Sequence, residues 1–129
     1  MNYLTVEAII EINKQMTGIS GDPFVLVDSA NLEYIVEAAK YKYEDKQGNE
    51  ATILKASFLL YQLAAKSHAF AEGNKRTAIS SCLAFLSLNG HYFDTSKHQE
   101  LLDFVLLAAQ GEQSINSIHK WLSQRVKRY

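Results

Sequence analysis

Residues 51–88 read ATILKASFLLYQLAAKSHAFAEGNKRTAISSCLAFLSL, and this stretch decides the fold. In its first part, about residues 50–66, apolar side chains recur at helical spacing and cover most of the helix circumference. Its last part, about residues 75–88, has the same character, while the polar segment 67–74 breaks both patterns. A helix that is apolar on most sides is a buried helix. The sequence therefore predicts two buried helices that flank one polar loop.

Two helices are predicted before this pair. Thr5 is a good N-cap, so a first helix is expected to begin there and to run to about Met16, with Gly18 allowing the chain to leave it. Asp28 or Ser29 caps a second helix, whose apolar face extends toward a turn at residues 46–49. The segment 19–28 between them contains a Gly-Asp-Pro turn and a short apolar run, which fits either a brief strand or a loop packed on the core.

Two more helices are predicted after the pair. Asn89-Gly90 ends the fourth helix, and Ser96 with Gln99 fits a capping box for a fifth helix that ends at Gly111. Ser114 caps a sixth helix. The expected fold class is all-α, a compact orthogonal bundle of about six helices. A single short hairpin near residues 19–28 or 44–50 is also compatible with the pattern.

Composition limits the classes of protein to which the chain can belong. With 129 residues and 47% hydrophobic content, residues 1–129 are expected to form a single domain. The one cysteine excludes an intrachain disulfide, and the net charge of −1 argues against direct nucleic-acid binding. The N-terminus lacks a basic leader, and no apolar run approaches the ~20 residues of a membrane helix. We therefore expect a cytoplasmic protein with no membrane partner.

The loop between the buried helices carries the chemistry, because residues 68–77, HAFAEGNKRT, concentrate polar and charged groups where a helix begins. A helix N-terminus attracts anions, Gly73 lets the backbone approach a ligand closely, and Lys75 and Arg76 add positive charge. Glu72 would repel a bare phosphate but suits Mg²⁺ bound together with phosphate. His68 is the group that can accept a proton near neutral pH. Together these residues predict nucleotide-dependent transfer to a hydroxyl.

Each of these residues also has an ordinary structural interpretation. Glu72 could form a local ion pair with Lys75 or Arg76, and Lys66 could be an exposed charge at a helix end rather than a phosphate ligand. Phe70 is interpreted as an anchor that holds the loop on the core. The cluster as a whole, at this spacing, favours a functional site.

The stretch HAFAEGNKRTA, residues 68–78, resembles the motif HxFx[D/E]GNGRxxR of the Fic/Doc family, in the form found in its Doc toxin branch. The segments LTVEAIIEIN, LAFLSLNG and AAQGEQSINSIHKWL also resemble that branch in order and spacing. The resemblance covers nearly the whole chain and implies the Fic/Doc fold. It implies that His68 is the base, that Glu72 holds Mg²⁺, and that Gly73 and Asn74 form the anion hole. Lys75 and Arg76 would then bind the transferring phosphate.

Two departures from the Fic motif indicate which phosphate is transferred. Lys75 stands at the second glycine of GNG, and Ile79 stands at the second arginine. In the resembled family these changes accompany a reversed nucleotide and transfer of the γ-phosphate of ATP. The acceptor implied is a threonine of elongation factor Tu, whose modification arrests translation.

Two alternatives remain open at this stage. Glu72 and Gly73 replace an aspartate and an alanine of the Doc pattern, which keeps Fic-type AMP transfer to a protein hydroxyl as a second function. A non-catalytic binding module of a toxin–antitoxin pair is the third. The inhibitory pattern [S/T]xxxE[G/N] is matched only in part by Ser29 and Glu33, because Tyr34 follows. The resemblance therefore implies restraint by a Phd-like antitoxin on a separate chain.

Overall fold

The computed structural model describes residues 1–129, apart from the side chain of Thr95. In chain order its elements are α1 (Val6–Ser20), α2 (Ser29–Tyr41), α3 (Gly48–Tyr61), the π-helical turn η1 (Gln62–Lys66), α4 (Asn74–Leu88), β1 (His91–Phe93), the 3₁₀ turn η2 (Thr95–Lys97), α5 (His98–Ala109), α6 (Ile115–Ser123) and β2 (Val126–Arg128). The prediction of an all-α bundle of about six helices is confirmed.

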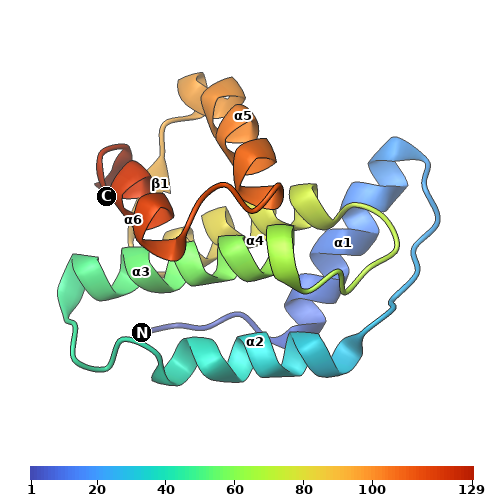
Figure 1. Ribbon diagram of the computed structural model, residues 1–129, viewed down its shortest axis with the longest axis horizontal. Helices are drawn as coiled ribbons and strands as arrows, with labels where there is room; N and C mark the ends of the chain where they lie inside the picture. Colours follow the sequence, from blue (N-terminus) through green and yellow to red (C-terminus); the bar gives the residue numbers. More distant parts are fainter.

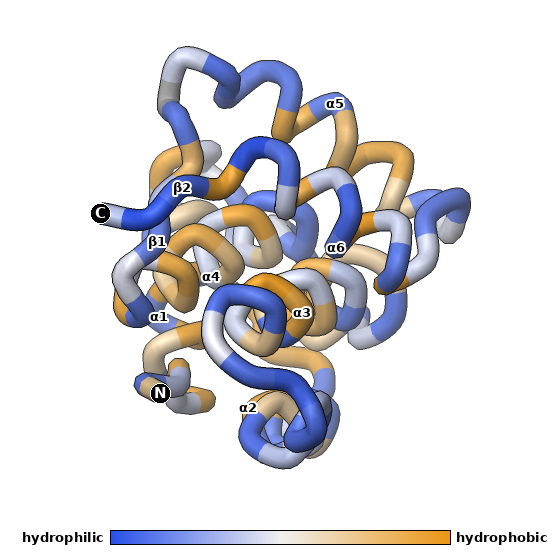
Figure 2. The backbone as a smooth tube through the Cα atoms, turned by 90° about the vertical axis from the view of Figure 1, so that its left-hand side faces the viewer, coloured by the Kyte–Doolittle hydropathy of each residue, from blue (hydrophilic) through white to orange (hydrophobic). Residues whose placement is uncertain are grey.

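The helix α3 lies at the centre of the bundle. Every residue from 51 to 60 is buried. Figure 1 shows α2 on one side of α3 and both α5 and α6 on the other. Figure 2 shows hydrophobic colour along α3 and α4, which agrees with their burial, and also along α5. The two buried helices read from the sequence therefore form the middle of the core, and the loop between them starts from a rigid base.

Three predicted helix caps are present in the structure. The Thr5 hydroxyl accepts a hydrogen bond from the Ala8 amide at 3.1 Å. The Asp28 carboxylate accepts one from Asn31 at 3.1 Å, and the Ser114 hydroxyl accepts one from Ser117 at 3.1 Å. Each cap satisfies an amide that the helix itself cannot pair, so the sequence located these three starts correctly.

The predicted end of the first helix was wrong. The helix α1 continues past Met16 to Ser20, and Gly18 lies inside it. Termination comes from Gly21, which adopts φ +79° and donates its amide to the Thr17 carbonyl. Glycine takes this left-handed conformation without steric cost, so the second glycine rather than the first ends the helix.

The capping box predicted at Ser96 and Gln99 was also wrong. Both the amide and the hydroxyl of Ser96 donate to the Asp94 carboxylate, at 3.0 and 2.8 Å, while Gln99 donates to Asp103. These bonds from Ser96 lower the pKa of Asp94. A charged oxygen is the stronger acceptor, so it holds Ser96 in a turn, and α5 begins only at His98.

The hairpin suggested at residues 19–28 or 44–50 does not form at either place. The two-stranded sheet instead pairs β1 with β2, antiparallel, with His91 opposite Arg128. In the 19–28 segment, Leu26 forms an isolated bridge with Phe70. Both pairings join segments far apart in the chain, and such pairings leave no local turn signal in a sequence.

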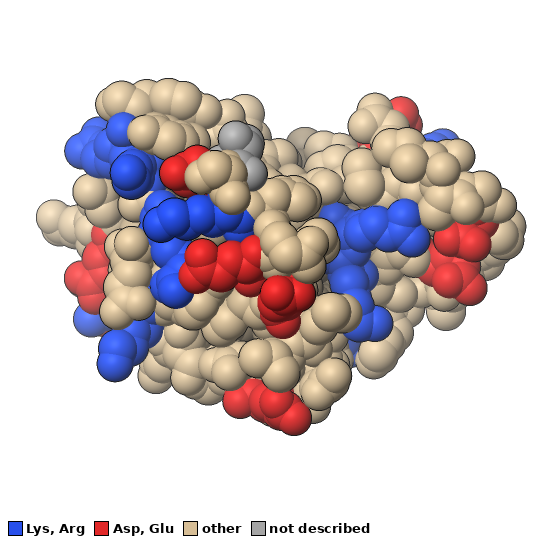
Figure 3. All heavy atoms as spheres, turned by 90° about the horizontal axis from the view of Figure 1, so that it is seen from above, with Lys and Arg blue, Asp and Glu red and all other residues tan. Residues whose placement is uncertain are grey.

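The surface carries charges of both signs. On the face shown in Figure 3, Lys and Arg side chains gather in separate groups, with Asp and Glu between and beside them. This mixing agrees with the net charge of −1. In the part of the chain that the structure describes, no helix combines the length and the apolar character needed to cross a membrane.

Candidate functional site

The loop between α3 and α4 leaves the core through an unusual backbone path. The helix α3 passes into the π-helical turn η1, and the Ser67 amide donates to the Gln62 carbonyl at 2.7 Å. His68 then adopts φ +43°, in the left-handed region that non-glycine residues rarely occupy. Both π-turns and strained residues are found preferentially at functional sites, where surrounding contacts hold them in place.

The middle of the loop is fixed to the core and to the segment before α2. Phe70 is only 3% exposed, and Val27 and Ala71 connect the two segments by main-chain hydrogen bonds. Asn74 closes the loop, because its Oδ1 accepts from the Phe70 amide at 3.2 Å and its Nδ2 donates to the Phe70 carbonyl at 2.7 Å. Both polar ends of Asn74 are therefore used to shape the loop.

The first turn of α4 lines a pocket. Gly73 is the N-cap with φ +79°, and it provides no side chain to cap the first amides of the helix. A pocket of about 290 Å³ lies here, lined by residues 71–76. Uncapped amides and the helix dipole favour an anion at this position. The pocket therefore has the character of a phosphate site.

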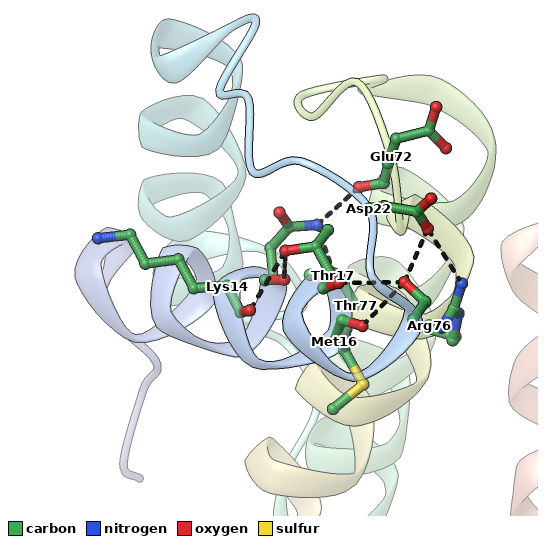
Figure 4. A network of polar contacts seen from close by, with 9 residues as sticks. Lys14, Met16, Thr17, Asp22, Glu72, Arg76 and Thr77 are labelled. Atoms are coloured by element: carbon green, nitrogen blue, oxygen red, sulfur yellow. Dashed lines mark hydrogen bonds and ion pairs between the residues drawn. The ribbon is translucent and has the colours of Figure 1, made fainter.

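Charged side chains surround this pocket. Lys75 and Arg76 are exposed, and the Arg76 guanidinium lies 3.9 Å from the Asp22 carboxylate. Among the described residues Glu72 forms neither a hydrogen bond nor an ion pair through its carboxylate, so the local ion pair considered for it is not formed. In Figure 4 this carboxylate points away from the polar network, while the Glu72 carbonyl points into it.

The free carboxylate of Glu72 fits the chemistry of a magnesium ligand. Mg²⁺ is commonly held by one or two carboxylates together with phosphate oxygens and water. Within the described part of the chain, no group of three or more His, Cys, Asp or Glu side chains could hold a metal without further ligands. Glu72 beside this pocket therefore has the donor chemistry that Mg²⁺ prefers.

The structure brings together five of the residues selected from the sequence and leaves two outside. Glu72, Gly73, Asn74, Lys75 and Arg76 line the pocket, whereas His68 and Lys66 do not. His68 is exposed. Lys66 ends the π-turn, and its ammonium lies over the Tyr61 ring at 5.5 Å from the centroid. This contact suits a solvent-facing charge better than a phosphate ligand.

Sequence reasoning missed the contribution of α1 and of the segment after it. Asn13 is fully buried and contacts the loop, and Asp22 pairs with Arg76. Asn13 follows Ile9 by four residues and so lies on the buried face of α1. An amide on an apolar helix face was the available signal, but its partners lie about 60 residues away in the sequence.

Comparison with known proteins places this architecture in a defined class. The chain belongs to the Fic/DOC family, whose family model matches residues 3–86, a span that contains the whole loop. It is also similar to the protein kinase doc of Escherichia phage P1. The two are 29% identical over 119 residues, which cover 92% of this chain and 90% of that protein.

Proposed function

We propose that this protein is a toxin kinase that transfers the γ-phosphate of ATP to a hydroxyl group of a protein. The observation that carries the proposal is the position of Lys75 in the first turn of α4, inside the pocket formed around Gly73. A lysine there adds a full positive charge to an anion site that the helix amides already provide. The similarity to a protein kinase of the same family supports the choice of phosphate transfer.

Each residue of the loop has a proposed role. The amides of the first turn, with Lys75 and Arg76, bind the γ-phosphate, and Glu72 with the phosphate oxygens holds Mg²⁺. The metal, when bound, neutralises negative charge on the phosphates. His68 takes the proton of the acceptor hydroxyl as its oxygen bonds to the γ-phosphorus, and the bond to the β–γ bridging oxygen breaks to release ADP.

The side chain at position 79 supports γ-phosphate transfer over AMP transfer. Ile79 is 5% exposed and follows Arg76 by one helical turn. The Fic motif has an arginine at this position, and an aliphatic side chain cannot pair with a phosphate. The remaining cations, Lys75 and Arg76, both lie in the first turn of α4. The triphosphate is therefore best held by one end, with its terminal phosphate in the pocket.

The target and the partner are proposed from the family resemblance. The acceptor is a threonine of a translation factor, elongation factor Tu, whose modification would arrest translation in the cytoplasm. A Phd-like antitoxin on a separate chain would restrain the toxin. The sequence supports restraint by a separate chain, because Tyr34 stands where the inhibitory pattern has a glycine or an asparagine.

The decisive experiment uses ATP labelled at either phosphate. Purified protein is incubated with elongation factor Tu, Mg²⁺ and ATP labelled at the γ- or the α-phosphate. We expect label on the factor from γ-labelled ATP alone, and no labelling by a His68→Ala variant. His98→Ala serves as the matched control, because His98 is exposed at the start of α5, and it should retain activity.

Other outcomes identify the alternative functions. Label from α-labelled ATP alone would replace the kinase proposal by AMP transfer, for which the glutamate and glycine at positions 72 and 73 are the favouring residues. The same assay can be repeated with a cell lysate in place of elongation factor Tu. If neither the γ-labelled nor the α-labelled ATP labels any protein in it, the protein acts as a non-catalytic binding module of a toxin–antitoxin pair.

A further inference from the structure

We propose that Asn13 of α1 is a positioning residue, which holds the phosphate-binding and metal-binding loop in its working conformation. This inference rests on the proposed function of the loop. It assigns a role to a helix that lies about 60 residues earlier in the sequence and contributes no side chain to the pocket lining.

The hydrogen bonds of Asn13 join α1 to both sides of Gly73. Its Nδ2 donates to the Glu72 carbonyl at 2.9 Å and to the Thr77 hydroxyl at 3.0 Å. A carbonyl can only accept, so the amide nitrogen has to face the loop. One buried amide thus fixes the last loop residue before Gly73 and the first turn of α4 to the same point.

The loop packs closely against α1 at Gly73. A Cβ atom at this position would lie 3.1 Å from Asn13 Nδ2 and 3.4 Å from Thr17 Cγ2. Thr17 is 1% exposed, and its hydroxyl donates to the Asn13 carbonyl at 2.9 Å. The loop therefore has no room to shift toward α1.

The direction of the Glu72 peptide follows from these bonds. Because Asn13 holds its carbonyl toward α1, the Glu72 carboxylate is directed to the opposite side, as Figure 4 shows. Without Asn13 the carbonyl would lose its donor, and we expect it to turn toward the uncapped amides of α4. A loop that turned to cap its own helix would occupy the anion site and withdraw the metal ligand.

The amide oxygen of Asn13, Oδ1, indicates that stability alone does not explain an asparagine at this position. Among the described residues Asn13 Oδ1 has no hydrogen-bond partner, although the side chain is fully buried. An unpaired buried acceptor is destabilising, and a leucine of similar size would avoid it. An amide at this position is therefore best explained by what its nitrogen does for the loop.

The test compares an Asn13→Leu variant with a core variant distant from the loop. Ile118→Val, in α6, is the control for a general loss of stability, and Thr77→Val removes one of the two bonds. Amide hydrogen exchange is measured without nucleotide at Phe70, Ala71 and Thr77, the loop amides that have hydrogen-bond partners. Binding of a non-hydrolysable ATP analogue with Mg²⁺ is measured by calorimetry. For the active protein, KM for ATP and kcat are measured separately.

We expect Asn13→Leu to speed exchange of these amides and to raise both the Kd and KM about tenfold, with a smaller change in kcat. Thr77→Val should give an intermediate effect, and Ile118→Val should match the wild type. Unchanged exchange in Asn13→Leu, or equal effects of Ile118→Val, would overturn the proposal. If the wild-type protein showed no γ-phosphate transfer, only the proposed function would be refuted. The exchange measurement needs neither nucleotide nor turnover.

Discussion

Two residues of the loop have left-handed backbone conformations, and they differ in how that conformation is maintained. Gly73, at φ +79°, adopts it without steric cost, whereas His68, at φ +43°, carries a side chain that disfavours it. The contacts on either side of His68 maintain its conformation, with Ser67 bonded to the π-turn and Ala69 bonded to Val27 and Asp28. The proposed base is therefore presented by the surrounding structure rather than by its own preference.

The first prediction concerns Gly73, which packs closely against Asn13. Gly73→Ala places a Cβ at positive φ and 3.1 Å from Asn13 Nδ2, so we expect the free energy of unfolding to fall by about 1–2 kcal/mol. Nucleotide binding should weaken as well, because the loop is displaced. Urea unfolding and calorimetry measure the two effects.

Gly18→Ala is the matched control. Gly18 lies inside α1, and a Cβ there would have no neighbour within 4 Å. Alanine should therefore stabilise the protein by up to about 1 kcal/mol through its higher helix propensity. If both substitutions lowered stability by similar amounts, neither the positive φ nor the close contact of Gly73 would be the cause.

The packing of α2 on α3 depends on one buried lysine. Lys55 of α3 is 4% exposed, and its ammonium donates to the Ala39 carbonyl at 2.7 Å, the Lys40 carbonyl at 3.1 Å and the Tyr3 hydroxyl at 2.8 Å. The two carbonyls belong to the last turn of α2, where a positive charge is favourable. All three N–H groups of the ammonium are thus satisfied without a carboxylate.

The second prediction follows from this arrangement. Lys55→Met keeps the apolar stem but leaves two carbonyls at the end of α2 without their donor, and we expect a loss of about 3 kcal/mol in the free energy of unfolding. Lys46→Met is the control, because Lys46 is an exposed lysine near Asp45 and Glu50 at 3.7 and 3.8 Å, and should change stability by less than about 0.5 kcal/mol. Chemical denaturation of both variants checks the difference, and similar losses would contradict this role of Lys55.

Across the whole molecule, residues from all six helices contribute to one hydrophobic core. The tryptophan Trp121 of α6 connects the later elements to it, because its ring stacks on Phe104 of α5 with centroids 4.1 Å apart and on Phe93 of β1 at 5.8 Å. The pairing of β1 with β2 joins the chain end to the exit of α4. The second half of the chain is therefore packed into the same unit as the loop.

The third prediction is that the protein unfolds in one cooperative step. Chains of fewer than about 150 residues with a single core usually behave in this way. Trp121 fluorescence reports on α5, α6 and β1, whereas far-ultraviolet circular dichroism reports on all helices. We expect the two urea transitions to share one midpoint. An earlier fluorescence transition would show that α5 and α6 unfold separately from the α1–α4 core.

Much of the fold and of the site was predictable because the signals are local. Apolar spacing together with cap residues predicted all six helices, and the caps at Thr5, Asp28 and Ser114 are set by atoms three residues away. The predicted end of α1 was wrong because Gly21, rather than Gly18, takes the left-handed conformation that ends the helix. The capping box at Ser96 was wrong because the Asp94 carboxylate accepts the hydrogen bonds of Ser96. The order of residues along the chain does not show which of two nearby glycines ends a helix, or which of two nearby acceptors a serine will bond.

By itself, the sequence determined the all-α fold, the two buried helices and the residues of the loop between them, since periodicity, caps and the motif all lie within short stretches. Only the tertiary structure decided how that loop is held. The contacts of Asn13 with Glu72 and Thr77, of Asp22 with Arg76, and of β1 with β2 join residues that are distant in the sequence. They form only when folding brings α1, α4 and the chain end together, because a hydrogen bond or an ion pair depends on distance in space and not on separation along the chain.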